Sequence, residues 1–182
     1  MPIFNKHKQP RECIISIYDN LTVLDNPNKN DKDRRKAVDE IAKALNTLRE
    51  NLTERPDTRV SGKDKDIDFT SNERARISEI ISDVTQEMIN RDMLPLLLSH
   101  LDAIEFESCK QVVELCGHIL RRPARSFNPM AQYLVEHQDI LNTLLMGYNK
   151  PETAIHYGAV RFCFLILLIG KVNCRNSFDL NQ

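Results

Sequence analysis

The sequence lacks the short motifs that mark the common nucleotide-dependent and hydrolytic enzymes. None of the P-loop, GxGxxG, GxSxG or HExxH patterns occurs in its 182 residues. Each of these patterns places a specific chemical group, such as phosphate-binding amides, an exposed nucleophile or a pair of metal ligands. We therefore expect no enzymatic activity and no cofactor.

The sequence also has no surplus of charge of either sign. Twenty-five lysines and arginines balance 26 aspartates and glutamates, for a formal net charge of -1. A basic excess would favour a nucleic-acid partner, and an acidic block would favour a solvated tail. Neither is present, so we expect protein partners and no nucleic acid.

Cysteine is present in a number and spacing that suit neither disulfides nor zinc. The chain has five cysteines, an odd number, without a CxxC pair, so we expect reduced thiols. Cys109, Cys116 and His118 fall in one predicted helix, but their spacing does not direct three ligands to one metal ion. No metal site is expected from them.

Three alternating aspartates resemble the start of a calcium-binding loop. Asp64, Asp66 and Asp68 take the first, third and fifth positions of such a loop. Phe69 stands where the sharp turn needs glycine, and Ala75 stands where the bidentate glutamate belongs. We interpret this stretch as a solvated acidic segment.

Long apolar runs are scarce as well. The first residues have no apolar core of the length that a secretory signal needs, so an intracellular, cytoplasmic protein is the expectation. The longest uninterrupted run, Phe162 to Gly170, is shorter than the ~20 residues that cross a bilayer, so no membrane span is expected. A buried or loosely packed terminal helix and translated intron sequence from about Val160 onward both remain as explanations of this run.

Helical periodicity is present almost throughout. Apolar residues at positions 38, 41, 45, 48 and 52 form one stripe, which predicts an amphipathic helix over 38–52. An earlier helix is predicted over 10–24, with Pro10 in its first turn. The polar stretch 54–69 has no period and is predicted to be an exposed, mobile loop.

Capping signals mark where later helices begin. Thr70 and Glu73 have the spacing of a capping box, and Asp92 is predicted to cap a short helix. A longer helix is predicted over 105–122, and further helical segments follow residues 129 and 149. Strand-like alternation is missing, so the sequence predicts an all-α fold, an armadillo- or HEAT-like α-solenoid of antiparallel helix pairs.

Four pieces of sequence within residues 94–160 form a specific pattern: "DAIEFE" at 102–107, "ILRR" at 119–122, "QDILNTLLMGY" at 138–148, and "PETA" at 151–154 followed by Gly158. In their order and spacing, residues 94–160 resemble the Mo25 (calcium-binding protein 39) scaffold family. A weaker match covers 1–52. We assign 1–160 to the N-terminal part of a Mo25-like helical-repeat domain, truncated to about its N-terminal half, and 161–182 to a tail that departs from the family.

The resemblance implies a noncatalytic scaffold that binds and helps to activate serine/threonine kinases. Members bind sterile-twenty-class kinases, and a liver-kinase-B-type kinase together with a pseudokinase adaptor. A truncated copy of such a scaffold, with reduced function, is also consistent with the resemblance. The family's pocket for the adaptor tail lies in C-terminal repeats that have no counterpart in this sequence. The alternative is a helical-repeat adaptor outside kinase signalling, in trafficking or cytoskeletal assembly.

One polar stripe is the candidate protein-binding surface. In the 105–122 helix, charged and polar residues recur at every fourth position opposite an apolar face, and a neighbouring arginine adds a planar hydrogen-bonding group. The stripe consists of Lys110, Glu114, His118 and Arg122, with Arg121 beside it. A plain solvated face is the alternative. We also predict self-association through the apolar C-terminal end.

Overall fold

The computed structural model describes residues 9–53, 66–120, 128–149 and 151–165, and within them the chain is helical with no strand. Seven helices, followed by a further helical segment over residues 154–165, make up this part of the chain: α1 (Pro10–Asp25), α2 (Asp31–Thr53), α3 (Asp66–Asn90), α4 (Met93–Ser99), α5 (Phe106–Leu120), α6 (Pro129–Glu136) and α7 (Asp139–Gly147). The predicted all-α fold is confirmed.

The first two helices form an antiparallel hairpin, as the sequence predicts. Helix α1 begins at Pro10, and the carboxylate of Glu12 accepts a 3.1 Å hydrogen bond from the backbone N–H of Gln9. The guanidinium group of Arg34 on α2 donates to the carbonyl oxygens of Leu24 and Asn26, at 3.0 and 2.9 Å. One side chain thus satisfies two carbonyl groups at the end of α1 and fixes the turn into α2.

The predicted start of the helix at Thr70 is wrong. Helix α3 begins at Asp66, so Thr70 lies inside the helix and is not its cap. Residues 66–69 of the predicted loop 54–69 are therefore helical, and residues 54–65 lie outside the described part of the chain.

Asp92 precedes α4 as predicted, but its side chain makes no capping hydrogen bond. Its backbone is in the left-handed region, with φ 49°. The Asp92 carboxylate instead accepts a hydrogen bond from the Tyr133 hydroxyl on α6. A tertiary contact has therefore taken the place of the local cap.

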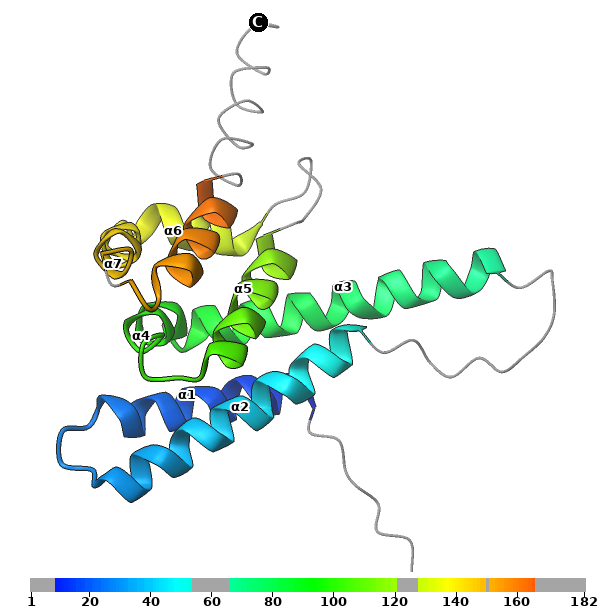
Figure 1. The fold of residues 1–182 in the computed structure, drawn as a ribbon. Coiled ribbons are helices and arrows are strands. Elements are labelled where there is room, and N and C mark those ends of the chain that lie inside the picture. Colours follow the sequence, from blue (N-terminus) through cyan, green and yellow to red (C-terminus); the bar gives the residue numbers. More distant parts are fainter. Residues whose placement is uncertain (1–8, 54–65, 121–127, 150, 166–182) are drawn as a thin grey trace, which may run out of the picture.

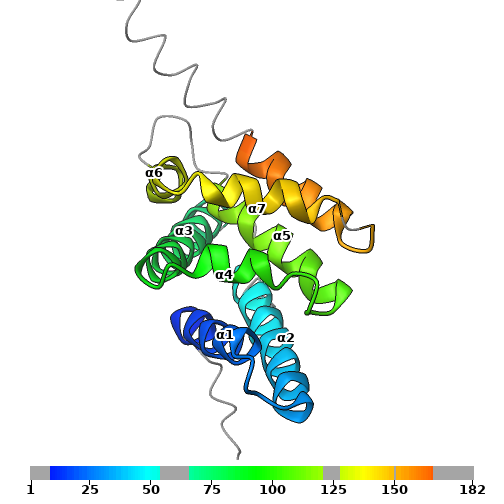
Figure 2. The same ribbon diagram turned by 90° about the vertical axis from the view of Figure 1, so that its left-hand side faces the viewer.

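The helices are arranged in three tiers. Figure 2 shows α1 and α2 in the first tier, α3, α4 and α5 in the second, and α6, α7 and the 154–165 helix in the third. Neighbouring tiers pack on each other: α1 packs on α3 and α4, α2 packs on α5, α4 packs on α7, and α3 and α5 pack on α6. Figure 1 shows α3 extending well beyond the other helices of its tier.

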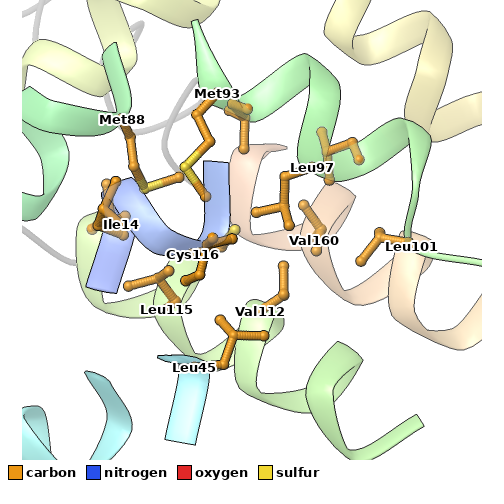
Figure 3. Close-up of a cluster of buried hydrophobic side chains, with 14 of the residues drawn as sticks. Ile14, Leu45, Met88, Met93, Leu97, Leu101, Val112, Leu115, Cys116 and Val160 are labelled. Atoms are coloured by element: carbon orange, nitrogen blue, oxygen red, sulfur yellow. The ribbon is translucent and has the colours of Figure 1, made fainter. Parts of the chain in front are cut away.

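A single apolar core runs through all three tiers. Figure 3 shows side chains from α1, α2, α3, α4, α5 and the 154–165 helix in one cluster, including Ile14, Leu45, Met88, Leu97 and Val160. These five residues are at most 2% exposed. Because each tier buries its apolar side on the next, the tiers stabilise one another, as in repeat proteins.

The last described helix is anchored on one face only. Its Phe164 is 1% exposed, whereas Phe162 and Leu165 are 64% and 39% exposed. The apolar residues predicted to surround this helix are therefore divided between a buried and an open side. The remaining residues of that prediction, Ile166, Leu168 and Ile169, lie outside the described part of the chain.

Candidate functional site at the α2–α5 boundary

The predicted polar stripe lies on α5, whose opposite face is buried. Val112, Leu115 and Ile119 are 0–4% exposed, so α5 is fixed against the core. Lys110 and Glu114 are exposed, and His118 is partly buried. These two exposed side chains and the partly buried imidazole are thus presented by a rigid helix, which suits a binding surface.

Arg121 and Arg122 lie outside the described residues, so their predicted part in the stripe stays a prediction. The described site therefore consists of the residues before Leu120.

The lysine of the stripe pairs within its own helix. The Lys110 ammonium group lies 2.7 Å from the Glu107 carboxylate, and the two side chains are 50% and 61% exposed. The hydrogen bond from Lys110, followed by its charge, lowers the pKa of Glu107. Exposed pairs of this kind contribute little stability, so breaking the Lys110–Glu107 pair costs the fold little.

A small cavity separates the stripe from α2. It measures about 10 Å³, roughly the space of one water-sized probe, and its lining comes from both helices: Leu45, Leu48, Arg49 and Leu52 of α2, and Gln111, Glu114, Leu115 and His118 of α5. Gln111 is 8% exposed, and its Oε1 is buried without a hydrogen-bond partner. The α2–α5 boundary thus has an apolar floor, a polar rim and one unsatisfied acceptor.

A larger hollow lies further toward the start of both helices. It measures about 610 Å³, and its lining includes Arg35 and Asp39 of α2 and Glu105 just before α5. Early residues of α2 therefore lie near the start of α5, and later residues of α2 lie near its later turns, so the two helices run in the same general direction. The charged rim of this boundary extends over several turns.

The charges along the boundary are mixed. Arg35 and Arg49 supply positive charge, whereas Asp39 and Glu114 supply negative charge, and all four side chains are exposed. Lys110, one turn before Glu114 on α5, adds a positive charge to the stripe. Alternating charges of this kind specify a partner's orientation more than they add affinity. The surface suits a protein that presents complementary acidic and basic groups.

The thiols of α5 do not have the character of nucleophiles. Burial raises the pKa of Cys109 to about 11 and that of Cys116 to about 12, so both are protonated at neutral pH. The Cys109 thiol donates to the Leu101 carbonyl oxygen at 3.1 Å. Both cysteines act as small apolar core residues.

No group of three or more His, Cys, Asp or Glu side chains within the described ranges is arranged to hold a metal ion. Among those same residues, no helix is both long and apolar enough to cross a membrane.

Comparison with known proteins decides which family this architecture represents. The model of the Mo25-like family matches residues 2–165. The chain belongs to the Mo25-like family. Its three stacked tiers are accordingly part of the helical-repeat solenoid that is typical of this family. Members of the family are scaffold proteins and are not known as enzymes.

Curated relatives of this Mo25-like chain come from distant organisms. A human protein named calcium-binding protein 39-like is 32% identical over 159 residues, which cover 87% of this chain and 42% of the relative. MO25-like protein 2 of Caenorhabditis elegans is 32% identical over 162 residues, with 87% and 43% covered. The Mo25-like protein of Schizosaccharomyces pombe is 26% identical, with 87% and 42% covered. The chain thus spans less than half the length of these relatives.

Arg49 and Gln111 are parts of the site that the sequence pattern did not predict. The helical pattern places Arg49 on the polar face of α2 but does not say which helix stands beside that face. Gln111 precedes the buried Val112 and is itself buried. Because glutamine side chains are mostly exposed in proteins, the sequence does not predict this burial. Only the packing of α2 against α5 brings the two residues to one boundary.

Proposed function

We propose that this Mo25-like chain is a noncatalytic scaffold that binds serine/threonine protein kinases and helps to hold them active. The observation that carries the proposal is the exposed face of α5, fixed by its buried side and flanked by the charged residues of α2. The partners suggested by the resemblance are sterile-twenty-class kinases, and a liver-kinase-B-type kinase with its pseudokinase adaptor.

A scaffold without catalytic groups activates a kinase by binding its active arrangement more tightly than the inactive one. Kinase activity depends on the position of one helix, which carries the glutamate of a lysine–glutamate pair at the nucleotide site. A ligand shifts such an equilibrium only by its difference in affinity for the two states. A rigid surface with oriented charges, such as the α2–α5 boundary, discriminates well between two positions of a facing helix.

Binding measurements with matched charge reversals test this proposal. Lys110→Glu removes the 2.7 Å pair with Glu107 on the proposed surface. Lys43→Glu removes the equivalent 2.8 Å pair with Glu40, which is also three residues apart, at residues of α2 that line neither hollow. The two changes cost similar helix stability, because both break exposed pairs of the same spacing.

We expect Lys110→Glu to weaken binding to a purified kinase by about fivefold or more, about 1 kcal/mol, and Lys43→Glu to leave it unchanged. Equal affinities for both variants and the unmodified chain would refute the assignment of this surface. Identification of the proteins that co-purify with the chain separates the proposal from the alternative adaptor role. Trafficking or cytoskeletal proteins in place of kinases would favour that alternative.

A further inference from the structure

A row of alternating charges follows the first turns of α2. Asp31, Arg35 and Asp39 lie one helical turn apart, and all three side chains are exposed. Opposite charges at this spacing often pair within a helix. Here none of the three forms an ion pair or a side-chain hydrogen bond with any residue of the described ranges. We call these three residues the α2 charge row.

The other cations on this part of α2 that could neutralise the row have partners of their own. The Arg34 guanidinium group donates to the carbonyl oxygens of Leu24 and Asn26, at 3.0 and 2.9 Å. The Lys43 ammonium group lies 2.8 Å from the Glu40 carboxylate. The charges of the row therefore remain available to a group from outside the described chain.

The α2 charge row lines a hollow that also has apolar surface. The hollow measures about 610 Å³, within the range of about 300–1,000 Å³ that is usual for binding pockets. Leu24, Val38 and Ala103 supply its apolar lining, and Glu105 adds a further carboxylate from the α5 side. The first turns of α2 follow the α1–α2 turn at one end of the first tier (Figure 1). A charged row beside apolar surface suits an amphipathic segment of a partner.

We infer that this hollow binds an α-helix of another protein, which carries basic, acidic and basic side chains at positions i, i+4 and i+8 beside an apolar residue. Four residues advance about 6 Å along any α-helix, so rows of this spacing on two helices have the same repeat. All three opposite charges then meet at once, which fixes the register of the partner. Helices that pack through such rows belong to the commonest packing class, which crosses at about −50°.

The hollow suits an extended segment less well than a helix. Side chains on one face of a strand repeat at about 6.6–6.8 Å, so they drift out of register along the row. The inference goes beyond the proposed function, because it names the chemistry of the bound segment and holds for a kinase or for any other protein partner.

A different protein, and not a second copy of this chain, is the inferred partner. Helix α5 carries Lys110, Glu114 and His118 at the matching spacing. However, Lys110 already pairs with Glu107, and His118 is partly buried. This stripe therefore offers a poorer complement than a helix whose three charges are free.

Three alanine-rich helical peptides of equal composition test the inference, each about 18 residues long so that it is helical in water. At four-residue spacing they carry Arg–Glu–Arg, Arg–Arg–Glu or Glu–Arg–Arg, with leucine beside the charges. Amide NMR shifts of the full chain, recorded during titration with each peptide, measure binding. We expect saturable shifts at residues 31–39 and 103–105 with Arg–Glu–Arg, and at least fivefold weaker binding of the other two peptides.

Two double variants that leave the net charge unchanged provide the matched control. Arg35→Glu/Asp39→Lys exchanges two charges of the row, so it should prefer Arg–Arg–Glu or Glu–Arg–Arg, according to the orientation of the bound helix, by fivefold or more. Lys36→Glu/Glu40→Lys makes the same exchange one position later, at residues that do not line the hollow, and should keep the preference for Arg–Glu–Arg. Circular dichroism shows whether each variant is folded.

Several results would overturn the inference. They are an absence of shifts at residues 31–39, equal affinity for the three peptides, and an unchanged preference in the Arg35→Glu/Asp39→Lys variant. Equally tight binding of a peptide with the same charges at every second position would exclude the helical register. Sedimentation of the full chain covers the remaining case, because a dimer that this double variant dissociates would assign the row to a second copy.

Discussion

The Tyr157 hydroxyl donates a 2.6 Å hydrogen bond to the Leu98 carbonyl oxygen, across 59 positions of sequence. Tyr157 is 3% exposed, so the bond lies in the interior. It joins the last described helix to the end of α4 and thereby links the second and third tiers.

Tyr157→Phe tests this link, because it removes the hydroxyl group and keeps the ring. We expect a loss of about 1 kcal/mol in the free energy of unfolding, the usual net value of one buried hydrogen bond. In a chain of this size the corresponding fall in melting temperature is about 2–4 °C. Tyr148→Phe, at a ring that is 55% exposed, is the control and should change neither quantity.

Gly147 is predicted to be intolerant of any side chain. A Cβ at this position would overlap the ring of Tyr157, which is buried and has no room to move. We expect Gly147→Ala to lower the free energy of unfolding by about 1–3 kcal/mol, the range for overpacked cores. Gly158→Ala is the matched control, because its Cβ would meet only the exposed Tyr148 ring at 3.3 Å. Equal stability of the two alanine variants would contradict this packing.

Glu87 connects α1 to α3 and gives a pH-dependent prediction. Its carboxylate is 6% exposed and lies 2.6 Å from Arg91 and 2.8 Å from Arg11. The hydrogen bond from Arg91 is the main cause that lowers the pKa of Glu87, from a usual value of 4.5. The ionised form is therefore favoured by folding, and its contribution is present above pH 4.5 and is lost as the pH falls through the folded value.

We expect Glu87→Gln to cost about 1–3 kcal/mol at pH 7, because two arginines lose a charged acceptor. Chemical denaturation at a series of pH values measures the difference in the free energy of unfolding between this variant and the unmodified chain. The difference should shrink as the pH falls below 4.5. A difference that stays constant down to pH 3 would show that the Glu87 charge does not contribute.

His156 also predicts a loss of stability as the pH falls, in this case because a buried neutral imidazole becomes protonated. It is 4% exposed, its Nε2 is buried without a hydrogen-bond partner, and its ring packs edge-on to Phe106 at 4.7 Å. Burial, and then the charge of Lys110, lower the pKa of His156 from its usual 6.5. Because the unfolded chain then binds the proton more readily, stability should fall as the pH drops below 6.5.

His156→Gln should reduce that loss of stability between pH 7 and pH 5. The comparison needs thermal melting of both proteins over this range, where the unperturbed carboxylates remain ionised. The same slope in both proteins would mean that another group titrates.

Local pattern predicted the helices, and tertiary packing decided the details. The period of apolar residues in 38–52 was sufficient to predict most of α2 and its buried side. The start of α3 was missed, because 66–69 have no apolar period and the Thr70–Glu73 spacing offered a plausible later start. Asp92 kept its position before α4, but its carboxylate found Tyr133 on α6, which local sequence gives no means of predicting.

The candidate site was predictable only in part, for the same reason. The spacing of Lys110, Glu114 and His118 predicts one helical face, and the structure places these residues on α5 opposite its buried side. The contribution of Arg49 depends on the packing of α2 beside α5.

The most direct test of the scaffold proposal is the effect of the purified chain on kinase activity. Phosphate transfer by sterile-twenty-class kinases, and by a liver-kinase-B-type kinase with its pseudokinase adaptor, should be measured at increasing concentrations of the chain. The account predicts that at least one kinase gains activity until the chain saturates it, and that Lys110→Glu shifts this curve to higher concentration whereas Lys43→Glu does not. Unchanged activity of every kinase at saturating concentrations of the chain would contradict the account.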